Sequence, residues 1–358
     1  MLRPPELIAA RHSMRSGAMP FDEYRAIEDL AVDDALKLQE EVGLEVVTDG
    51  EMRRDIFFGF FVNGMAGLVP GSAGKVVFHN DETDNAMEVE IPFTVASKVE
   101  PLPCPGVDEF VYASKRTSLP VKVTLPSPMM VLGFWGEGSR SAYPDPFELA
   151  RDTAEVVKGW MKELADAGCR HIQIDAPEIN EACVSEQIRA EYASRGIDPD
   201  EFIEVGTQLV GELGNLDLPG VTKSVHVCKG NGTQSWIAEG GYDVFAERVF
   251  ASLSGFDVFH FEYDDERSGS LEPLKLLPDD KVAVLGFVST KWVALEDPDE
   301  LRNRIHEAAE FHPLERLALA PQCGFASGAE TAADRKITED TQRQKLQLVV
   351  DVARSVWQ

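Results

Sequence analysis

The sequence lacks any apolar run long enough to cross a bilayer, and its first residues lack the apolar core and cleavage site of a secretory signal. We therefore expect a cytoplasmic protein that does not enter the membrane. An excess of basic residues is also absent, because 62 acidic residues outnumber 34 basic ones and give a formal net charge of −28. No lysine and arginine cluster interrupts this acidity. A nucleic-acid partner is therefore not expected, and a polyanionic substrate would bind against the overall field.

Cysteine is scarce, with five residues in 358 and no C-x-x-C pair. The odd number and wide spacing argue against a disulfide framework and against a dithiol redox centre. Isolated cysteines are usually small apolar core residues, and this interpretation suits Cys104, Cys169 and Cys183. The other two, Cys228 and Cys323, lie at or just after the ends of segments with the pattern of buried strands.

Strand and helix patterns alternate from about residue 20 onward, which is typical of a parallel α/β fold. Helical spacing of apolar residues covers 21–42, and a second helix opens at Asp145-Pro146, with Glu148 placed for a capping box, and stops at Gly168. A closing helix is expected over 339–357. Seven short apolar segments have the pattern of strands: 44–47, 120–125, 171–175, 223–228, 257–262, 281–288 and 316–321.

These elements predict a TIM-type (β/α)8 barrel that forms one domain over residues 1–358. An eighth strand is still required, and we expect it either before residue 1 or from another segment that closes the barrel. The stretch 74–118 interrupts the alternation. Within it, residues 76–95 have the pattern of a β-hairpin around a polar turn, and a proline-rich connection follows. We interpret this stretch as an insertion after the second barrel strand, serving as a lid or as a contact in a homo-oligomer.

Side chains capable of metal binding occur where predicted strands end. In a parallel barrel every strand directs its C-terminal end to the same face, so residues far apart in the chain converge there. His226 and Cys228 are two positions apart in an extended segment and point to the same side. Together with Glu262 and Cys323 they offer two thiolates, an imidazole and a carboxylate, a donor set that favours zinc. The alternative is that both cysteines are core thiols and Glu262 is one of several solvated acids.

Two further carboxylates, Glu51 and Asp175, also follow strand ends. A pair of carboxylates suits a buried ammonium group, such as the α-amino group of an amino acid. The alternatives are that Asp175 caps the end of its strand and that Glu51 neutralises Arg53 or Arg54.

Five motifs, in order along nearly the whole chain, resemble the C-terminal catalytic half of cobalamin-independent methionine synthase and the single-barrel proteins built on that half. They are TDGEMRR (48–54), HIQIDAPEI (171–179), HVCKGN (226–231), HFEYDDERSG (260–269) and APQCGFAS (320–327). The resemblance implies that Glu51 and Asp175 hold the amino group of homocysteine. It also implies a Zn²⁺ cofactor with four ligands: His226, Cys228, Glu262 and Cys323.

Three departures from the family pattern concern the second substrate. The chain contains no counterpart of the N-terminal half of the full-length synthase, nor of a Gly-Ser turn that contacts the substrate carboxylate. Residues 289–291, Ser-Thr-Lys, stand where the full-length enzyme has a catalytic histidine.

The resemblance implies a zinc-dependent S-methyltransferase of methionine biosynthesis, which transfers a methyl group from methyl-folate or another carrier to homocysteine. Zinc makes a bound thiol reactive by deprotonating it, and we expect Glu262 to loosen when the substrate sulfur enters. Two alternatives remain open. Single-barrel relatives include epoxyalkane:coenzyme M transferase, in which zinc activates a different thiol toward an epoxide. The second alternative is a zinc-binding barrel that catalyses no reaction, because a fold alone does not fix function.

Overall fold

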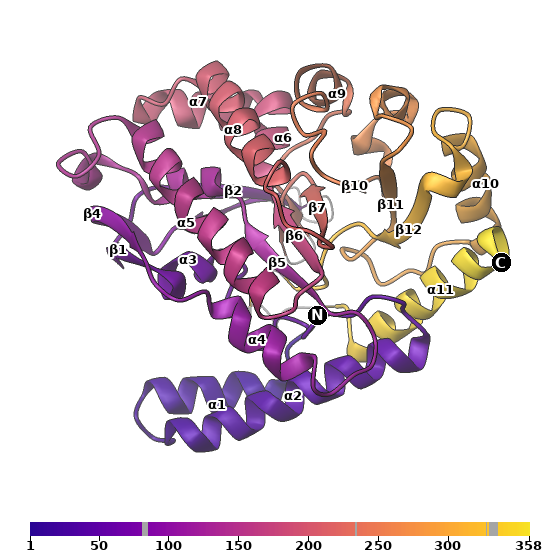
Figure 1. The fold of residues 1–358 in the computed structure, drawn as a ribbon, viewed down its shortest axis with the longest axis horizontal. Coiled ribbons are helices and arrows are strands. Elements are labelled where there is room, and N and C mark those ends of the chain that lie inside the picture. Colours follow the sequence, from indigo (N-terminus) through magenta and orange to yellow (C-terminus); the bar gives the residue numbers. More distant parts are fainter. Residues whose placement is uncertain (81–84, 233–234, 327, 329–335) are drawn as a thin grey trace.

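The computed structural model describes residues 1–80, 85–232, 235–326, 328 and 336–358. A six-stranded parallel sheet with the order β12-β11-β10-β7-β6-β5 lies at its centre (Figure 1). Every strand of this sheet is one of those predicted, with small shifts at the ends. The strands are β5 (Lys122–Pro126), β6 (His171–Asp175), β7 (Thr222–Val227), β10 (Val258–Glu262), β11 (Val282–Val288) and β12 (Leu317–Pro321).

The predicted strand 44–47 is reduced to one parallel bridge beyond β5, between Val47 and Val121. The N–H of Val47 donates to the carbonyl of Pro120 at 3.0 Å, and the N–H of Lys122 donates to the carbonyl of Val47 at 2.8 Å. The bridge extends the parallel order past β5, so the residues after Val47 lie at the same end of the sheet as those after β5. The α/β barrel architecture predicted from the sequence is confirmed.

Helices pack around this sheet, and α1 and α2 form a long pair at one end of the molecule (Figure 1). Helices α2 and α11 have the predicted bounds, whereas α1, with few buried apolar residues, was not predicted. The helices are α1 (Pro5–Arg15), α2 (Phe21–Val42), α3 (Gly59–Gly64), α4 (Pro105–Ala113), α5 (Pro146–Asp166), α6 (Pro177–Val184), α7 (Glu186–Arg195), α8 (Pro199–Gly214), α9 (Asp243–Val249), α10 (Pro298–Ala308) and α11 (Glu339–Trp357). Short 3-10 helices are η1 (Pro128–Phe134), η2 (Glu137–Ser139), η3 (Glu266–Ser268), η4 (Glu272–Leu276) and η5 (Leu314–Arg316).

Helix α5 illustrates how local sequence sets a boundary. The side chain of Asp145 accepts a hydrogen bond from the N–H of Phe147 at 2.9 Å, and Pro146 occupies the first turn, where its missing N–H is harmless. The reciprocal half of the predicted capping box is not formed, because the Glu148 carboxylate pairs with Lys98. The predicted apolar face is buried throughout: Leu149, Thr153, Val156, Trp160 and Leu164.

The insertion contributes two antiparallel pairs beside the barrel. Strand β2 (Lys75–Asn80) pairs with β3 (Asn85–Glu90), as the predicted hairpin requires, while its turn at 81–84 lies outside the described residues. Strand β1 (Met65–Pro70) pairs with β4 (Phe93–Pro101). The proline-rich connection contains a helix, α4. Pro105 stands in the first turn of this helix, where proline is favourable.

The insertion is joined to the chain just beyond β7. Strands β8 (Asn231–Gly232) and β9 (Ser235–Trp236) pair with each other, and His79 of β2 pairs with Trp236. The rings of His79 and Trp236 stack with centroids 4.8 Å apart. The hairpin therefore lies beside the segment that carries His226 and Cys228.

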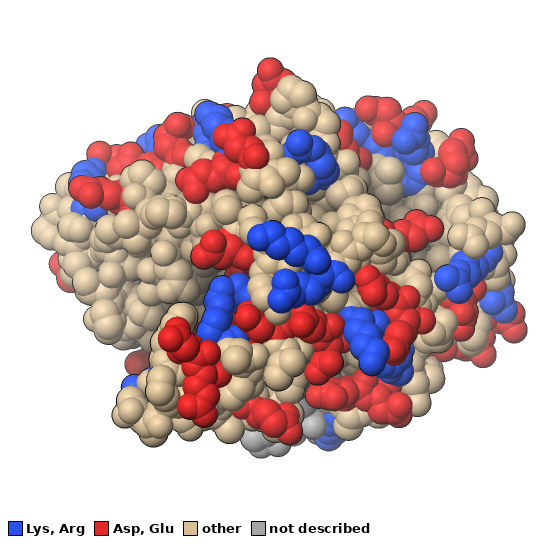
Figure 2. Space-filling view, turned by 60° about the horizontal axis from the view of Figure 1, so that its bottom comes forward, with Lys and Arg blue, Asp and Glu red and all other residues tan. Residues whose placement is uncertain are grey.

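The surface matches the acidic composition. Figure 2 shows acidic and basic side chains intermingled over the face that is turned forward. No helix in the described part of the chain is both long enough and apolar enough to span a membrane.

Candidate metal centre

A cavity of about 1140 Å³ brings together side chains from separate parts of the chain. Five of the six predicted site residues line it: Glu51, Asp175, His226, Cys228 and Cys323. Another part of its wall is apolar and comes mainly from the insertion, the segment before α3, and α7: Phe57, Phe58, Phe78, Ile91, Ile188 and Tyr192. The cavity thus has a polar wall at the strand ends and an apolar wall beside the insertion.

His226, Cys228 and Cys323 form the candidate metal cluster. One donor atom from each residue lies within 4.8 Å of the other two. His226 belongs to β7 and Cys228 follows the last residue of that strand, so the alternation of an extended chain turns both toward one side. Cys323 reaches them from the loop after β12.

The chemistry of this cluster fits a zinc ion. Two sulfurs and an imidazole nitrogen are donors that zinc prefers. The Nε2 atom of His226 is buried and has no hydrogen-bond partner within the described residues. A buried nitrogen in that state destabilises the fold unless a ligand satisfies it. The cluster therefore has both the donor types and the unsatisfied atom expected of a metal site.

Two side chains of this cluster, Cys228 and His226, have raised pKa values. A hydrogen bond with Cys323, together with burial, raises the pKa of the Cys228 thiol well above its usual value. Burial lowers the pKa of His226, but the neighbouring Cys228 and the charges of Asp175 and Glu262 outweigh this effect and raise that pKa to about 9. A metal ion that bound here would therefore displace protons, which would make its affinity depend on pH.

Glu262 is the predicted ligand that stands apart from this cluster. It ends β10, is 1% exposed, and is not among the described residues that line the cavity. Its Oε1 accepts a hydrogen bond from Nζ of Lys291 at 2.8 Å, and its Oε2 accepts one from the backbone N–H of Lys229 at 2.9 Å. Burial raises the pKa of Glu262, but the positive charges of Lys291 and Lys229 outweigh it and lower the pKa. The side chain is therefore an ionised carboxylate with both oxygens engaged.

Asp175 ends β6 and has one oxygen available to a ligand. Its Oδ1 accepts a hydrogen bond from Nε2 of Gln173 at 2.7 Å, and Gln173 in turn accepts one from Nζ of Lys122 at 2.6 Å. Within the described residues, Oδ2 accepts no hydrogen bond. Burial raises the pKa of Asp175, so a cationic group in the cavity would stabilise its charged form.

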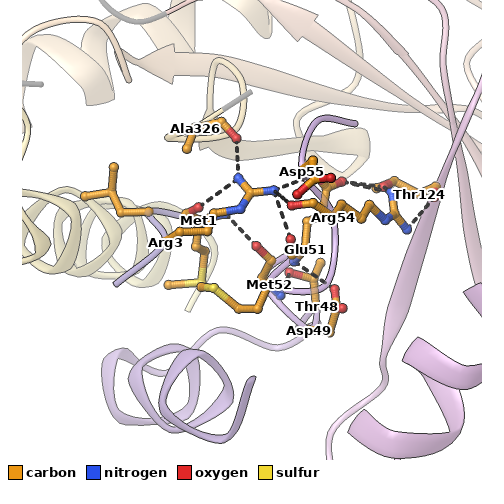
Figure 3. A network of polar contacts seen from close by, with 12 residues as sticks. Met1, Arg3, Thr48, Asp49, Glu51, Met52, Arg54, Asp55, Thr124 and Ala326 are labelled. Atoms are coloured by element: carbon orange, nitrogen blue, oxygen red, sulfur yellow. Dashed lines mark hydrogen bonds and ion pairs between the residues drawn. The ribbon is translucent and has the colours of Figure 1, made fainter. Parts of the chain in front are cut away.

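Glu51 lies in a network of arginines (Figure 3). Its Oε1 accepts hydrogen bonds from Nη1 of Arg54 at 3.2 Å and from Oγ1 of Thr124 at 2.7 Å, while its Oε2 lies 3.9 Å from Nη2 of Arg3. Burial alone would raise the pKa of Glu51, but the charges of Arg54 and Arg3 outweigh it and lower the pKa to about 2. Glu51 therefore pairs with Arg54, one of the two arginines considered in the alternative interpretation, while remaining on the cavity wall.

The turn that carries Glu51 is fixed by its own side chains and by Arg3. Asp49 Oδ1 accepts the N–H of Glu51 at 2.9 Å, and Glu51 alone among the described non-glycine residues has a positive φ, of 56°. Such a conformation costs about 1 kcal/mol or more and persists only where its surroundings impose it. Arg3 donates to the carbonyls of Glu51 at 2.9 Å and Ala326 at 2.7 Å (Figure 3). Arg3 thus connects this turn to the loop of Cys323.

Three residues that contact the candidate ligands were not predicted as site residues: Gln173, Lys229 and Lys291. The sequence contains a signal for Gln173, because its spacing in HIQID places it on the same face as Asp175. Lys229 and Lys291 lie in loops, where no periodic pattern indicates which way a side chain points. Their role follows from tertiary contacts alone.

Comparisons with known proteins agree with this fold. Residues 4–205 match the family described as "Cobalamin-independent synthase, Catalytic domain". The uncharacterised Bacillus subtilis protein YxjH is 34% identical over 360 residues, which cover 100% of this chain and 93% of that protein. A methionine synthase of Sulfurisphaera tokodaii is 25% identical over 90% of this chain and 83% of its own. A solved structure of a putative vitamin-B12-independent methionine synthase from Listeria monocytogenes has a TM-score of 0.76 and 26% identity, covering 100% and 96% of the two chains. The chain therefore belongs to the family of the cobalamin-independent synthase catalytic domain.

Proposed function

We propose that this protein is a zinc-dependent thiol S-methyltransferase that converts homocysteine to methionine. His226, Cys228 and Cys323 would hold the zinc, and Glu262 would be a weakly held fourth ligand. Bound zinc would supply deprotonation of the substrate thiol at neutral pH. The observation that carries the proposal is the cluster of two sulfurs and an imidazole, with an unpartnered Nε2, on the wall of a large cavity.

Asp175 and Glu51 bind the amino group of the substrate in this proposal. Asp175 has an oxygen that accepts no hydrogen bond within the described residues, and its other oxygen is fixed by Gln173. Glu51 is already paired with Arg54. Its main contribution is therefore a negative charge at a fixed position, and it offers less as a free hydrogen-bond acceptor. Two carboxylates on the cavity wall together favour an ammonium group over a neutral thiol without one.

The remaining volume suits a second substrate. About 1140 Å³ exceeds the range of roughly 300–1,000 Å³ that is usual for small-molecule pockets. The wall formed by residues such as Phe58, Ile91 and Tyr192 is apolar, which favours a donor with an apolar or aromatic body. The net charge of −28 opposes a donor that carries several carboxylates.

The proposal is tested with zinc-loaded protein, homocysteine, and either methyl-folate or methylcobalamin, with methionine measured by mass spectrometry. Methionine should form with at least one donor, disappear on chelation, and return when zinc is restored. Cys323→Ser should abolish the reaction. Cys183→Ser is the matched control, because Cys183 is a free cysteine outside the metal cluster and should leave the reaction intact.

Two parallel experiments test the alternative functions, epoxide opening by a thiol and zinc binding without catalysis. If coenzyme M and a small epoxide give a thioether while homocysteine gives no methionine, the protein is an epoxide-opening thiol transferase and the proposal is wrong. Binding of homocysteine in calorimetry, without transfer from either donor, would indicate a zinc-binding barrel that does not catalyse methyl transfer.

A further inference from the structure

A buried lysine contacts the carboxylate of Glu262, the predicted fourth metal ligand. Lys291 follows β11, and its side chain is fully buried. Its Nζ lies 2.8 Å from Oε1 of Glu262, 3.1 Å from Oδ2 of Asp264 and 3.5 Å from Oδ2 of Asp265. One ammonium group thus contacts three carboxylates, and one of these belongs to the predicted fourth metal ligand.

The loop of Lys291 is attached to the loops that carry the metal ligands. The N–H and the hydroxyl of Thr290 both donate to Oε1 of Gln322, at 2.8 and 2.5 Å. Gln322 immediately precedes Cys323, and its Nε2 donates to Oδ1 of Asn231 at 2.9 Å. Because these bonds link the three loops, Lys291 has a defined position relative to the metal cluster.

The charges around Glu262 are balanced. Three cations, Lys229, Lys291 and Arg267, accompany three carboxylates, Glu262, Asp264 and Asp265. Nη2 of Arg267 lies 4.0 Å from Glu262, and Nζ of Lys229 lies 3.7 Å from the centre of the Tyr242 ring. If Glu262 turned toward a metal ion, Lys291 would still have Asp264 as a partner. Lys291 can therefore release this carboxylate without being left as a buried charge alone.

We propose that Lys291 is a positioning residue that competes with the metal for the Glu262 carboxylate and thereby keeps one coordination position open to the substrate thiol. This inference rests on the proposed function only in that a metal is bound by the cluster near Glu262. Lys291 and Glu262 are both almost completely shielded from water, at 0% and 1% side-chain exposure, so their attraction is weakly screened. A carboxylate held in this way binds a metal less tightly than a free one, and an incoming thiolate displaces it more readily.

The test is to replace the ammonium group and measure metal binding directly. In Lys291→Met, Glu262 loses its ammonium partner at Oε1. It keeps the backbone N–H of Lys229 at Oε2 and the more distant guanidinium of Arg267. The zinc affinity, measured by competition with a chromophoric chelator, should therefore rise by about tenfold, the size of change in metal affinity that substitutions beside metal ligands usually produce. Homocysteine should bind the cobalt(II)-substituted variant correspondingly more weakly, as seen in the thiolate-to-cobalt absorption. Lys291→Arg keeps a cation beside Glu262 and should behave like the natural protein.

Two further variants separate this mechanism from a general disturbance. Lys345→Met removes another fully buried ammonium, which pairs with Glu296. Glu296 also accepts the N–H of Ser289, so this pair holds the loop that carries Lys291. The substitution leaves Lys291 and Glu262 paired. It should not tighten zinc binding. In a Glu262→Gln background, Lys291→Met should have little additional effect, because the competition acts through that carboxylate.

Zinc affinity that stays the same or falls in Lys291→Met overturns the inference, since Lys291 then has no effect on Glu262 or supports it as a ligand. The same holds if the effect persists in the Glu262→Gln background. Tighter zinc binding without methyl transfer in the natural protein would refute the proposed function and leave the role of Lys291 standing. If Lys291→Met does not fold, Lys291→Gln provides the same comparison with a neutral hydrogen-bond donor.

Discussion

Glu51→Gln tests how much the charge of Glu51 stabilises the arginine network around it. Glu51 contacts Arg54 and Thr124 and lies near Arg3, which is fully buried. Glutamine has nearly the same shape but removes the negative charge. Arg3 and Arg54 would then keep carbonyl partners, and Arg54 would keep Glu109, but the charge that lies between them would be gone.

The magnitude follows from the pKa of Glu51. Its decrease from 4.5 to about 2 corresponds to about 3 kcal/mol of folding stability. The folded-state pKa is lowered, so this contribution is complete above the unfolded-state pKa near 4.5 and is lost as the pH falls through about 2. Glu51→Gln should therefore lower the free energy of unfolding by about 3 kcal/mol at pH 7, and the difference should narrow by roughly 1 kcal/mol at pH 4.

Urea unfolding of both proteins at pH 7 and pH 4, followed by circular dichroism, measures this difference. Glu23→Gln is the control, because Glu23 is exposed on α2 and its substitution should change stability by no more than about 0.5 kcal/mol. Equal stability of Glu51→Gln and the natural protein at pH 7 would refute the reasoning, as would a difference that grows on acidification.

Three further predictions concern the cavity wall. Cys323→Ser removes one of three clustered donors and should lower the zinc retained after dialysis, measured by atomic absorption; unchanged zinc content would show that Cys323 is not a ligand. Asp175→Asn should raise KM for homocysteine by about tenfold while leaving the binding of a thiol without an amino group unaffected; equal losses for both thiols would contradict a contact with the amino group. Burial raises the pKa of Glu178 to about 8, so the folded protein keeps this carboxyl protonated while the unfolded chain ionises above pH 4.5. Stability should then fall between pH 5 and 8, and Glu178→Gln should remove up to about 1.4 kcal/mol per pH unit from that slope in urea unfolding; identical slopes would rule this out.

The barrel strands could be predicted from the sequence because each is a short apolar run in a periodic alternation with helices. β6, at 171–175, has the predicted bounds, and the other strands of the parallel sheet differ only at their ends. Segment 44–47 has the same pattern but forms a single bridge, because the turn at Thr48 to Glu51 begins immediately after it. Apolar composition indicates that a segment is buried, and the neighbouring turn decides how much of it pairs.

The sequence predicts which site residues lie close together, but it does not predict the hydrogen-bond partners of those residues. The sequence places His226, Cys228 and Cys323 at or just after strand ends, and in the structure their donor atoms lie within one cluster. Glu262 also follows from the pattern, yet its oxygens are held by Lys291 and by the backbone of Lys229. Loops have no fixed period, so the sequence cannot indicate where a lysine 29 residues further along the chain will direct its ammonium group.

The sequence by itself determined the parallel α/β architecture, the family and the three residues of the candidate metal cluster, because repeating apolar patterns and strand ends are local properties of a chain. Only the tertiary structure decided that Glu51 is paired with Arg54, that Asp175 is held by Gln173, and that Glu262 contacts a buried lysine. Charged side chains in a water-poor interior take whichever partner the fold places within a few ångströms, since an unpaired charge there is strongly unfavourable. That choice depends on distances between loops, which local sequence does not encode.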